Sequence, residues 1–163
     1  MSTFLVRQAT LEDFRIVSNI LCEAASWLKQ QNMTLWGEQE ISAKVVLSDI
    51  KSGLFYIAFY ENCAAGVVKF QTEDLIFWSD IPHHDSAFIH RLAVRRSFAG
   101  KSASTALMKW AVDRSRQLGK LYLRLDCDAE RLSLRSVYEN FGFRHHSDRQ
   151  VGAYFVARYE YKI

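Results

Sequence analysis

The stretch Ala87-Phe-Ile-His-Arg-Leu-Ala-Val94 runs directly into Arg95-Arg-Ser-Phe-Ala-Gly-Lys-Ser-Ala-Ser104. The first part is a mostly apolar run of strand length, which is typical of a strand buried on both faces. Apolar residues then recur at helical spacing and form one helix face: Ala103, Ala106, Leu107, Trp110 and Ala111. Gly119 ends this helix, and 121–126 reads as a further strand. A strand, helix and strand in this order favour parallel pairing with a right-handed crossover.

The rest of the chain supplies the elements around this unit. Apolar periodicity and Gly or Pro punctuation predict strands at 4–7, 54–60 and 63–71, helices at 11–30, from Ser42 to Gly53 and over 134–141, and a closing hairpin of 143–150 and 153–162. The order is β-α-α-β-β-β-α-β-α-β-β, with no repeat or linker. We expect one domain over residues 1–163, of the α/β (α+β) class, with a mixed central β-sheet flanked by helices.

Composition excludes several classes of protein. The 163 residues are 49% apolar and 24% charged, which is close to the average for globular domains and unlike disordered chains. No apolar run reaches the ~18–20 residues of a membrane span. The segment 1–7 lacks the pattern of a signal peptide. The net charge of +3 suits an anionic ligand but is too small to argue for nucleic acid.

The cysteines indicate the compartment. Cys22, Cys63 and Cys127 are an odd number, lie far apart and form no C-x-x-C pair. A disulfide framework or a structural zinc site is therefore not expected, and a reducing cytoplasm fits best.

The turn after Val94 has the features of a phosphate site. Free backbone N–H groups at a helix N-terminus, together with the helix dipole, attract phosphate. Small residues allow a close approach to the backbone, and Arg95, Arg96 and Lys101 add positive charge. The residues alone fit an ordinary strand-to-helix turn with solvated charges equally well.

A family resemblance bears on this choice. The segment Leu92-Ala-Val-Arg-Arg-Ser-Phe-Ala-Gly-Lys-Ser-Ala-Ser-Thr-Ala-Leu-Met108 resembles the acetyl-CoA-binding segment of the GNAT acyltransferase superfamily. Leu123-Arg-Leu-Asp-Cys127 and Tyr138-Glu-Asn-Phe-Gly-Phe143 resemble its second signature. The order of elements is similar along the whole chain, most specifically over 88–143. The resemblance implies a GNAT-like sheet in which a splayed pair of parallel strands binds acyl-CoA.

The resemblance also implies a cofactor site, with acetyl-CoA as cofactor, coenzyme A as product and no metal. The pantetheine arm would lie along the backbone of Leu92, Ala93 and Val94 like an extra strand. The family's pyrophosphate motif, Gln/Arg-x-x-Gly-x-Gly/Ala, falls on Ala99, Gly100, Lys101, Ser102, Ala103 and Ser104.

Two departures from the family pattern concern this site. Ala99 replaces the leading residue of the motif, and Ser102 and Ser104 replace its glycines. A serine keeps the backbone donors, but its Cβ crowds the phosphate. The family's usual Asn before the last helix falls on Arg131.

The implied reaction is direct attack of an amine on the thioester, which requires a base to take the amine proton. His90 lies two residues before Leu92, where the family often has Glu or His, and is the candidate base. Tyr138 matches the family's tyrosine and is the candidate acid. A hydrogen-bonded core histidine and a core aromatic residue are the alternatives for these two positions.

An acceptor pocket is expected near 27–38 and 73–80. Trp36, Phe77 and Trp78 would form an aromatic wall, with Glu38, Asp74 or Asp80 attracting a cationic amine. The alternative is that these aromatic residues pack in the core or under a lid. The neighbouring pairs His83-His84 and His145-His146 lack the spacing of metal ligands.

The sequence thus predicts a cytoplasmic, acyl-CoA-dependent N-acetyltransferase acting on a primary amine, with a small-molecule amine as its partner. Neither nucleic acid nor membrane is expected to bind, and a homodimer is left open. One alternative is a non-catalytic acyl-CoA-binding or sensing domain with a degenerate pyrophosphate loop. The other is nucleic-acid binding through Arg95, Arg96 and Lys101.

Overall fold

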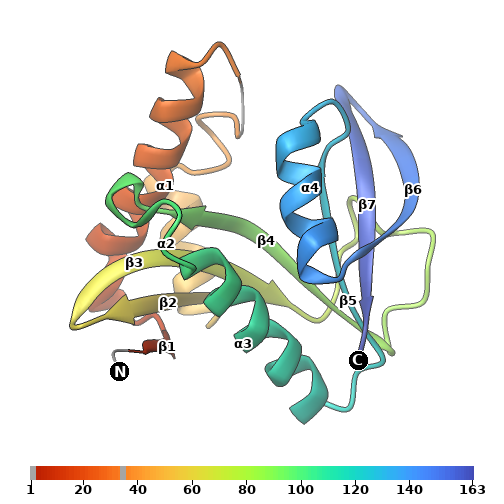
Figure 1. Ribbon diagram of the computed structural model, residues 1–163, viewed down its shortest axis with the longest axis horizontal. Coiled ribbons are helices and arrows are strands. Elements are labelled where there is room, and N and C mark those ends of the chain that lie inside the picture. The colour runs from red at the N-terminus through yellow and green to blue at the C-terminus, as the bar shows by residue number, and fades with distance from the viewer. Residues whose placement is uncertain (1–2, 34–35) are drawn as a thin grey trace. The chain divides into compact units, whose positions relative to one another are not determined.

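The computed structural model describes residues 3–33 and 36–163. Its elements follow the predicted order (Figure 1). The strands are β1 (Phe4–Gln8), β2 (Phe55–Tyr60), β3 (Cys63–Gln71), β4 (Ser86–Val94), β5 (Tyr122–Asp128), β6 (Arg144–Val151) and β7 (Tyr154–Lys162). The helices are α1 (Phe14–Gln30), α2 (Ala43–Lys51), α3 (Ala103–Gln117) and α4 (Leu132–Phe141), with short 3₁₀ helices at Leu11–Asp13 and Arg96–Phe98.

The strands form one mixed sheet in the order β1-β2-β3-β4-β5-β7-β6. β4 pairs with β5 in parallel, while β1 with β2, β2 with β3, β5 with β7 and β6 with β7 pair antiparallel. The predicted fold class, a mixed sheet flanked by helices with a parallel pair at its centre, is confirmed.

The chain divides into two compact units. The first comprises residues up to 69 and 91–108, and the second comprises 70–90 and 109–163. β3, β4 and α3 each contribute residues to both units. A single domain over 1–163 stays a prediction, and the two units are described separately below.

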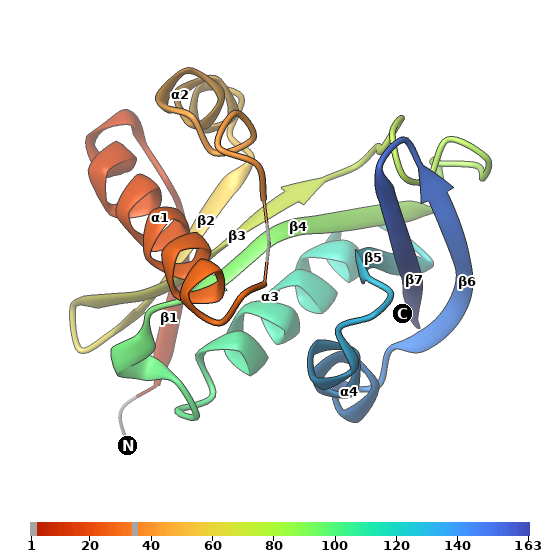
Figure 2. The same ribbon diagram turned by 90° about the horizontal axis from the view of Figure 1, so that it is seen from above.

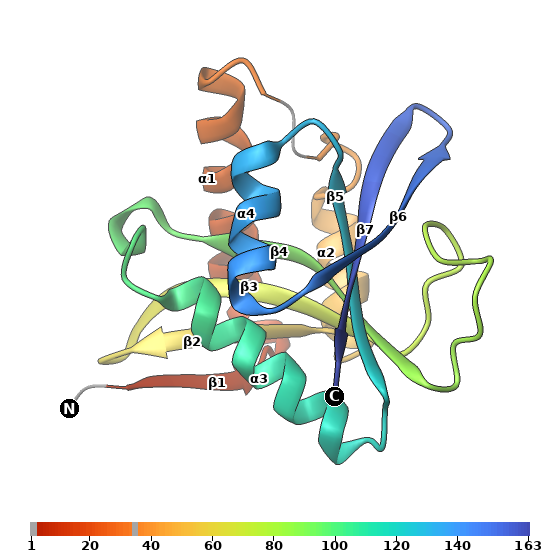
Figure 3. The ribbon, with the colours of Figure 1, turned by 45° about the vertical axis from the view of Figure 1, so that its right-hand side comes forward.

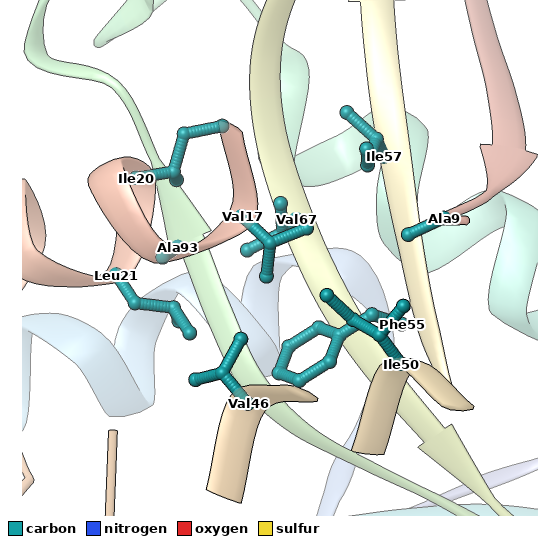
Figure 4. Packing of buried hydrophobic residues seen from close by; sticks show 10 residues of the cluster. All are labelled: Ala9, Val17, Ile20, Leu21, Val46, Ile50, Phe55, Ile57, Val67 and Ala93. Carbon is teal, nitrogen blue, oxygen red and sulfur yellow. The ribbon is translucent and has the colours of Figure 1, made fainter. Parts of the chain in front are cut away.

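The core of the first unit lies between its two N-terminal helices and its strands. α1 and α2 lie on the same side of β2 and β3 (Figure 2). The buried cluster of this unit, shown in Figure 4, consists of Ala9, Val17, Ile20, Leu21, Val46, Ile50, Phe55, Ile57, Val67 and Ala93. Burying each large aliphatic side chain contributes about 1.5–3 kcal/mol. Ala93 places the end of β4 in this core.

The N-terminus of α1 is fixed by a carboxylate. Asp13 accepts hydrogen bonds from the Thr10 backbone N–H at 2.8 Å and from both terminal nitrogens of Arg7 at 2.8 and 2.9 Å. The helix expected from Leu11 begins here as one 3₁₀ turn and becomes α-helical at Phe14.

Gly66 allows β3 and β4 to approach closely within the first unit. A Cβ at this position would lie 2.7 Å from the Ala93 carbonyl oxygen and 3.2 Å from Leu107 Cδ1. The Arg95 N–H donates to the Ala65 carbonyl at 2.8 Å, so the β3 backbone also anchors the residue that follows β4.

Arg91 has a left-handed backbone, with φ at 53°, inside β4. This conformation costs an L-residue about 1–2 kcal/mol. The Arg91 guanidinium lies 3.6 Å from Glu40 Oε1 and 5.6 Å from the centre of the Trp36 ring, and these contacts hold the residue in place. Such strain in a strand occurs most often beside functional sites.

In the second unit, β5 runs beside the β6–β7 hairpin with α4 close by (Figure 3). The parallel pairing between β4 and β5 runs from Ser86↔Tyr122 to Phe88↔Arg124. Trp78, from the loop between β3 and β4, is fully buried and packs against Phe88.

Within the described ranges, no helix is both long and apolar enough to cross a lipid bilayer.

Candidate active site

His90 lies two residues beyond the parallel pairing of β4 with β5. Its side chain is only 12% exposed and lies between two carboxylates of the second unit. Nε2 is 3.0 Å from Asp74 Oδ2, and Nδ1 is 3.9 Å from Asp126 Oδ2. Each ring nitrogen of His90 therefore faces an acid, and the general base and the hydrogen-bonded core histidine both stay predictions for this residue.

Asp74 is held rigidly by the backbone of its own loop. Its Oδ1 accepts hydrogen bonds from the Ile76 and Phe77 N–H groups, both at 2.9 Å. Its Oδ2 is buried, and the close contact with His90 has the length of an ion pair but lacks the direction of a hydrogen bond. Burial alone would raise the pKa of Asp74, but the contact with His90 and the two amides outweigh it and lower the pKa.

Asp126 is oriented by Trp78, whose indole N–H donates to Asp126 Oδ2 at 3.3 Å. The guanidinium groups of Arg124 and Arg158 lie 5.5 and 4.6 Å from the Trp78 ring. The structure thus places Trp78 in the core, which was the alternative to an acceptor wall. Trp78 is connected to His90 through Asp126, the residue to which its indole N–H donates.

The carboxylate of Asp80 accepts hydrogen bonds from two arginines. Arg158 donates to both of its oxygens at 2.7 and 3.0 Å, and Arg149 donates to Oδ1 at 2.8 Å. The hydrogen bonds from Arg158 lower the pKa of Asp80 to about 2. Of the three acids predicted to attract an amine, Asp74 is the one that contacts His90.

The other predicted aromatic residues are half-buried in separate units. Trp36 lies under the Arg91 guanidinium in the first unit. Phe77 packs edge-on against Tyr154 in the second unit, and its N–H and carbonyl groups bind Asp74 and Arg158. Glu38 is exposed.

Tyr138 lies on α4 of the second unit with its ring against Phe143 and Tyr159. Burial raises the pKa of its hydroxyl well above the ordinary value. Arg131 lies at the N-cap of the same helix. Its Nε is buried and has no hydrogen-bond partner among the described residues.

The turn predicted to bind phosphate lies in the first unit and exposes backbone donors. Gly100 and Ser102 have left-handed backbones, with φ at 74° and 67°, on either side of Lys101. Such alternation turns successive N–H groups toward one point and makes a concave anion site. The N–H groups of Gly100, Ser102, Ala103 and Ser104 donate to no acceptor in the described part of the chain.

The strand leading to this turn is well anchored. Ala93 is buried, and Leu92 and Val94 are half-buried at the end of β4. The Arg96 N–H donates to Glu23 Oε2 at 3.1 Å, and its guanidinium lies 3.8 Å from the Trp27 ring centre. Ala99 ends the short 3₁₀ helix, its N–H bonded to the Arg96 carbonyl.

The contacts of His90 with Asp74 and Asp126 were not predicted from the sequence. Asp126 was not a candidate site residue, and Asp74 was considered only as an attraction for an amine. No periodic signal links positions 74, 90 and 126, because they lie on a loop and two different strands.

Comparison with known proteins agrees with the fold. The sequence profile of the Acetyltransferase (GNAT) family matches residues 21–143. The chain is 30% identical over 147 residues to the uncharacterized N-acetyltransferase YesJ of Bacillus subtilis, covering 86% of this chain and 81% of YesJ.

Two solved structures are similar over nearly all of the chain. A GNAT-family acetyltransferase from Listeria monocytogenes has a TM-score of 0.82 at 23% identity, with 98% of this chain and 95% of the other covered. PaiA N-acetyltransferase from Thermoplasma acidophilum, solved in complex with coenzyme A, has a TM-score of 0.75 at 18% identity, with coverage of 98% and 99%.

The chain belongs to the GNAT acetyltransferase family, and it is an acyltransferase.

Proposed function

We propose that the chain transfers an acetyl group from acetyl-CoA to a primary amine of a small molecule, with His90 as general base. The position of His90, at the end of the parallel pairing and between two carboxylates, carries this proposal. A charged ammonium cannot attack a thioester, so the site must hold a group that accepts its proton. An imidazole does so near neutral pH.

The turn after β4 supports acetyl-CoA as the acyl donor. Its left-handed residues Gly100 and Ser102, and the N–H groups of Gly100, Ser102, Ala103 and Ser104 that have no acceptor among the described residues, suit a pyrophosphate. The buried Arg131 Nε also has no acceptor in the described part of the chain, and a cofactor oxygen would supply one. The structurally similar PaiA protein was solved with coenzyme A. Leu92, Ala93 and Val94 would pair with the pantetheine arm through their backbone.

The reaction has a simple balance. His90 takes the ammonium proton and releases it to solvent. The neutral amine nitrogen then forms a bond to the thioester carbon, the carbon–sulfur bond breaks, and the second proton that the nitrogen loses passes to His90. Coenzyme A leaves as a thiolate, which Tyr138 stabilises. The raised pKa of Tyr138 keeps its hydroxyl protonated, so it acts as a hydrogen-bond donor to the sulfur.

The acceptor is an amine with an apolar part. Trp36 and Phe77 are half-buried aromatic residues, and each is suited to line an apolar surface. Asp80 is paired with Arg158 and Arg149, so it contributes little to amine binding.

The test is the His90→Gln variant, assayed by release of the coenzyme A thiol over a panel of amines. Loss of a general base is expected to lower kcat by about 10²- to 10⁴-fold. Affinity for coenzyme A, measured by calorimetry, should stay within about twofold, because His90 is outside the phosphate turn. His84→Gln is the matched control, since His84 is exposed. Unchanged turnover in His90→Gln would remove His90 from the mechanism.

One observation favours a second function, that of a non-catalytic acyl-CoA sensor. Ser102 adopts a glycine-like backbone at φ 67°, and its Cβ narrows the phosphate turn. A sensor would bind acetyl-CoA in calorimetry and release no thiol with any amine.

The free thiols support a reducing compartment such as the cytoplasm. Cys22 and Cys63 are exposed and Cys127 is buried, all unpaired. Burial raises the pKa of the Cys127 thiol to about 12, so it does not serve as a nucleophile.

A further inference from the structure

We propose that Asp74, His90 and Asp126 form a binding site for one divalent transition-metal ion, with Zn²⁺ as the ion their chemistry favours. One carboxylate oxygen from each acid and one imidazole nitrogen lie within 4.8 Å of one another. The ligands come from the loop before β4, from β4 and from β5, all within the second unit. The site therefore does not depend on how the two units are arranged.

Hydrogen bonds position both carboxylates, Asp74 through its far oxygen Oδ1 and Asp126 through Oδ2, the oxygen that faces His90. The Ile76 and Phe77 N–H groups hold Asp74 through Oδ1 and leave Oδ2 toward His90. Trp78 holds Asp126 from the core. Rigid, buried ligands of this kind lose little freedom when an ion binds.

Asp74 Oδ2 is the second, independent observation. It belongs to a residue that is 7% exposed, and its 3.0 Å contact with His90 Nε2 lacks the direction of a hydrogen bond, so this oxygen accepts no hydrogen bond within the described residues. A buried carboxylate oxygen without a hydrogen bond is costly. A cation placed between Asp74, His90 and Asp126 supplies the missing interaction.

Geometry distinguishes a metal ion from an ammonium group. An ion about 2.1 Å from both Asp74 Oδ2 and His90 Nε2 would subtend about 90° across their 3.0 Å separation, whereas an ammonium nitrogen about 2.8 Å away would subtend about 65°. The first angle suits a coordinated ion. The second is much narrower than the tetrahedral spread of N–H bonds.

The charge and type of the ligands favour zinc. Two aspartates supply carboxylate oxygens, whose negative charge a divalent ion offsets. The nearby Arg124 pairs with Glu160 and Asp85, and Arg158 pairs with Asp80. One nitrogen and two oxygen ligands suit Zn²⁺ with an open position, and Zn²⁺ binds such sites more tightly than Mn²⁺ or Fe²⁺.

Two of the other histidines have partners of their own. His83 Nε2 contacts the Trp78 carbonyl, and His145 Nε2 pairs with Asp148. The set 74, 90 and 126 is the metal-capable group found among the described residues.

The test is binding of Zn²⁺ alone to the EDTA-treated full chain, by equilibrium dialysis and elemental analysis. Wild type should bind one ion per chain. His90→Ala and Asp126→Asn should each weaken binding at least tenfold, while Asp113→Asn, a change in an exposed ion pair on α3, should not. Exposed Cys22 and Cys63 are present in every variant, so differences report the cluster.

Thermal melting gives a second readout. Zn²⁺ should raise the melting temperature of wild type by several degrees and leave that of His90→Ala unchanged, because only the native site binds the ion. If His90→Ala does not fold, His90→Gln keeps a similar size and lacks the imidazole. Wild type without Zn²⁺ binding, or a His90 variant that binds as tightly as wild type, would overturn the proposal.

A consequence for activity rests on the proposed function. A metal ion on His90 uses the lone pair that accepts the amine proton, so Zn²⁺ should inhibit acetyl transfer and EDTA should restore it. The two proposals fail differently. Absence of thiol release from the metal-free chain would overturn the proposed function and leave Zn²⁺ binding intact. Active enzyme that binds no Zn²⁺ would overturn the metal site alone.

Discussion

His90 Nε2 lies 3.0 Å from Asp74 Oδ2, and Asp74 is in turn held by two backbone amides of its own loop. The position of the imidazole is therefore set by a rigid loop as well as by β4. Asp74 thus acts on the acceptor amine through His90, as a positioning residue.

Replacement of Asp74 by Asn keeps the shape of the side chain and removes its charge. We expect kcat for acetyl transfer to fall about 10- to 100-fold. This loss is smaller than that expected when the base itself is removed. Affinity for coenzyme A should stay within twofold of wild type. Steady-state kinetics and calorimetry check this, and a melting curve confirms folding. Equal activity of Asp74→Asn and wild type would mean that His90 needs no carboxylate.

The phosphate turn provides a second prediction, through Gly100→Val. Gly100 has φ at 74°, and the space where a Cβ would lie is open, so valine strains the backbone and projects into the turn. Affinity for coenzyme A should fall at least tenfold. Gly119→Val is the matched control, since Gly119 has φ at 70° and equally open surroundings. Both substitutions should lower the free energy of unfolding by a similar amount, and only Gly100→Val should weaken the binding of coenzyme A.

Ser102→Gly tests the same turn in the opposite direction. Glycine removes a strain of about 1 kcal/mol at φ 67°, and this gain is offset by about 0.5–1 kcal/mol of chain entropy, so stability should hardly change. Removal of the Cβ opens the turn to the phosphate. We expect coenzyme A to bind several-fold more tightly in calorimetry. Weaker binding by Ser102→Gly would show that the serine hydroxyl contacts the cofactor.

The sequence predicted the elements well because turns and periodicity are local signals. Gly119 and Gly142 end their helices where expected, and Ser42 caps α2 through the Val45 N–H. The parallel pairing of β4 and β5 also follows from the helix between them. The helix ends and the cap depend on neighbours within a few residues, whereas the pairing depends on the order of whole elements.

The candidate site was only partly predictable. His90 is a candidate because it lies where the GNAT family often has Glu or His, but its contacts with Asp74 and Asp126 arise from tertiary packing. The loop at 72–85 has no periodicity, so the burial of Trp78 could not be read from it. The left-handed backbone of Arg91 was not predicted either, because an arginine in the sequence does not indicate a positive φ.

Acid stability should depend on Asp13. Hydrogen bonds from Arg7 lower the pKa of Asp13 to about 2 from an ordinary 3.8. A pKa lowered by folding gives stability that is present above pH 4 and is lost as the pH falls from about 4 to 2. Because Arg7 is 44% exposed, the contribution is about 1–2 kcal/mol. Asp13→Asn should lose this amount at neutral pH and match wild type near pH 2 in urea unfolding.

Tyr138→Phe separates two roles for the buried hydroxyl. A thiol has a pKa of about 8.5 and an ordinary tyrosine about 10, and burial raises the pKa of Tyr138 further. Full proton transfer from Tyr138 to the departing thiolate is therefore uphill, and a hydrogen bond to the sulfur is the stronger expectation. Loss of this hydrogen bond in Tyr138→Phe should lower kcat about tenfold, because one hydrogen bond to a charged group contributes on that scale. The affinity for coenzyme A should change little. Thiol-release kinetics from pH 6 to 9 provide the check. A loss of 10³-fold or more would instead indicate that Tyr138 donates its proton outright.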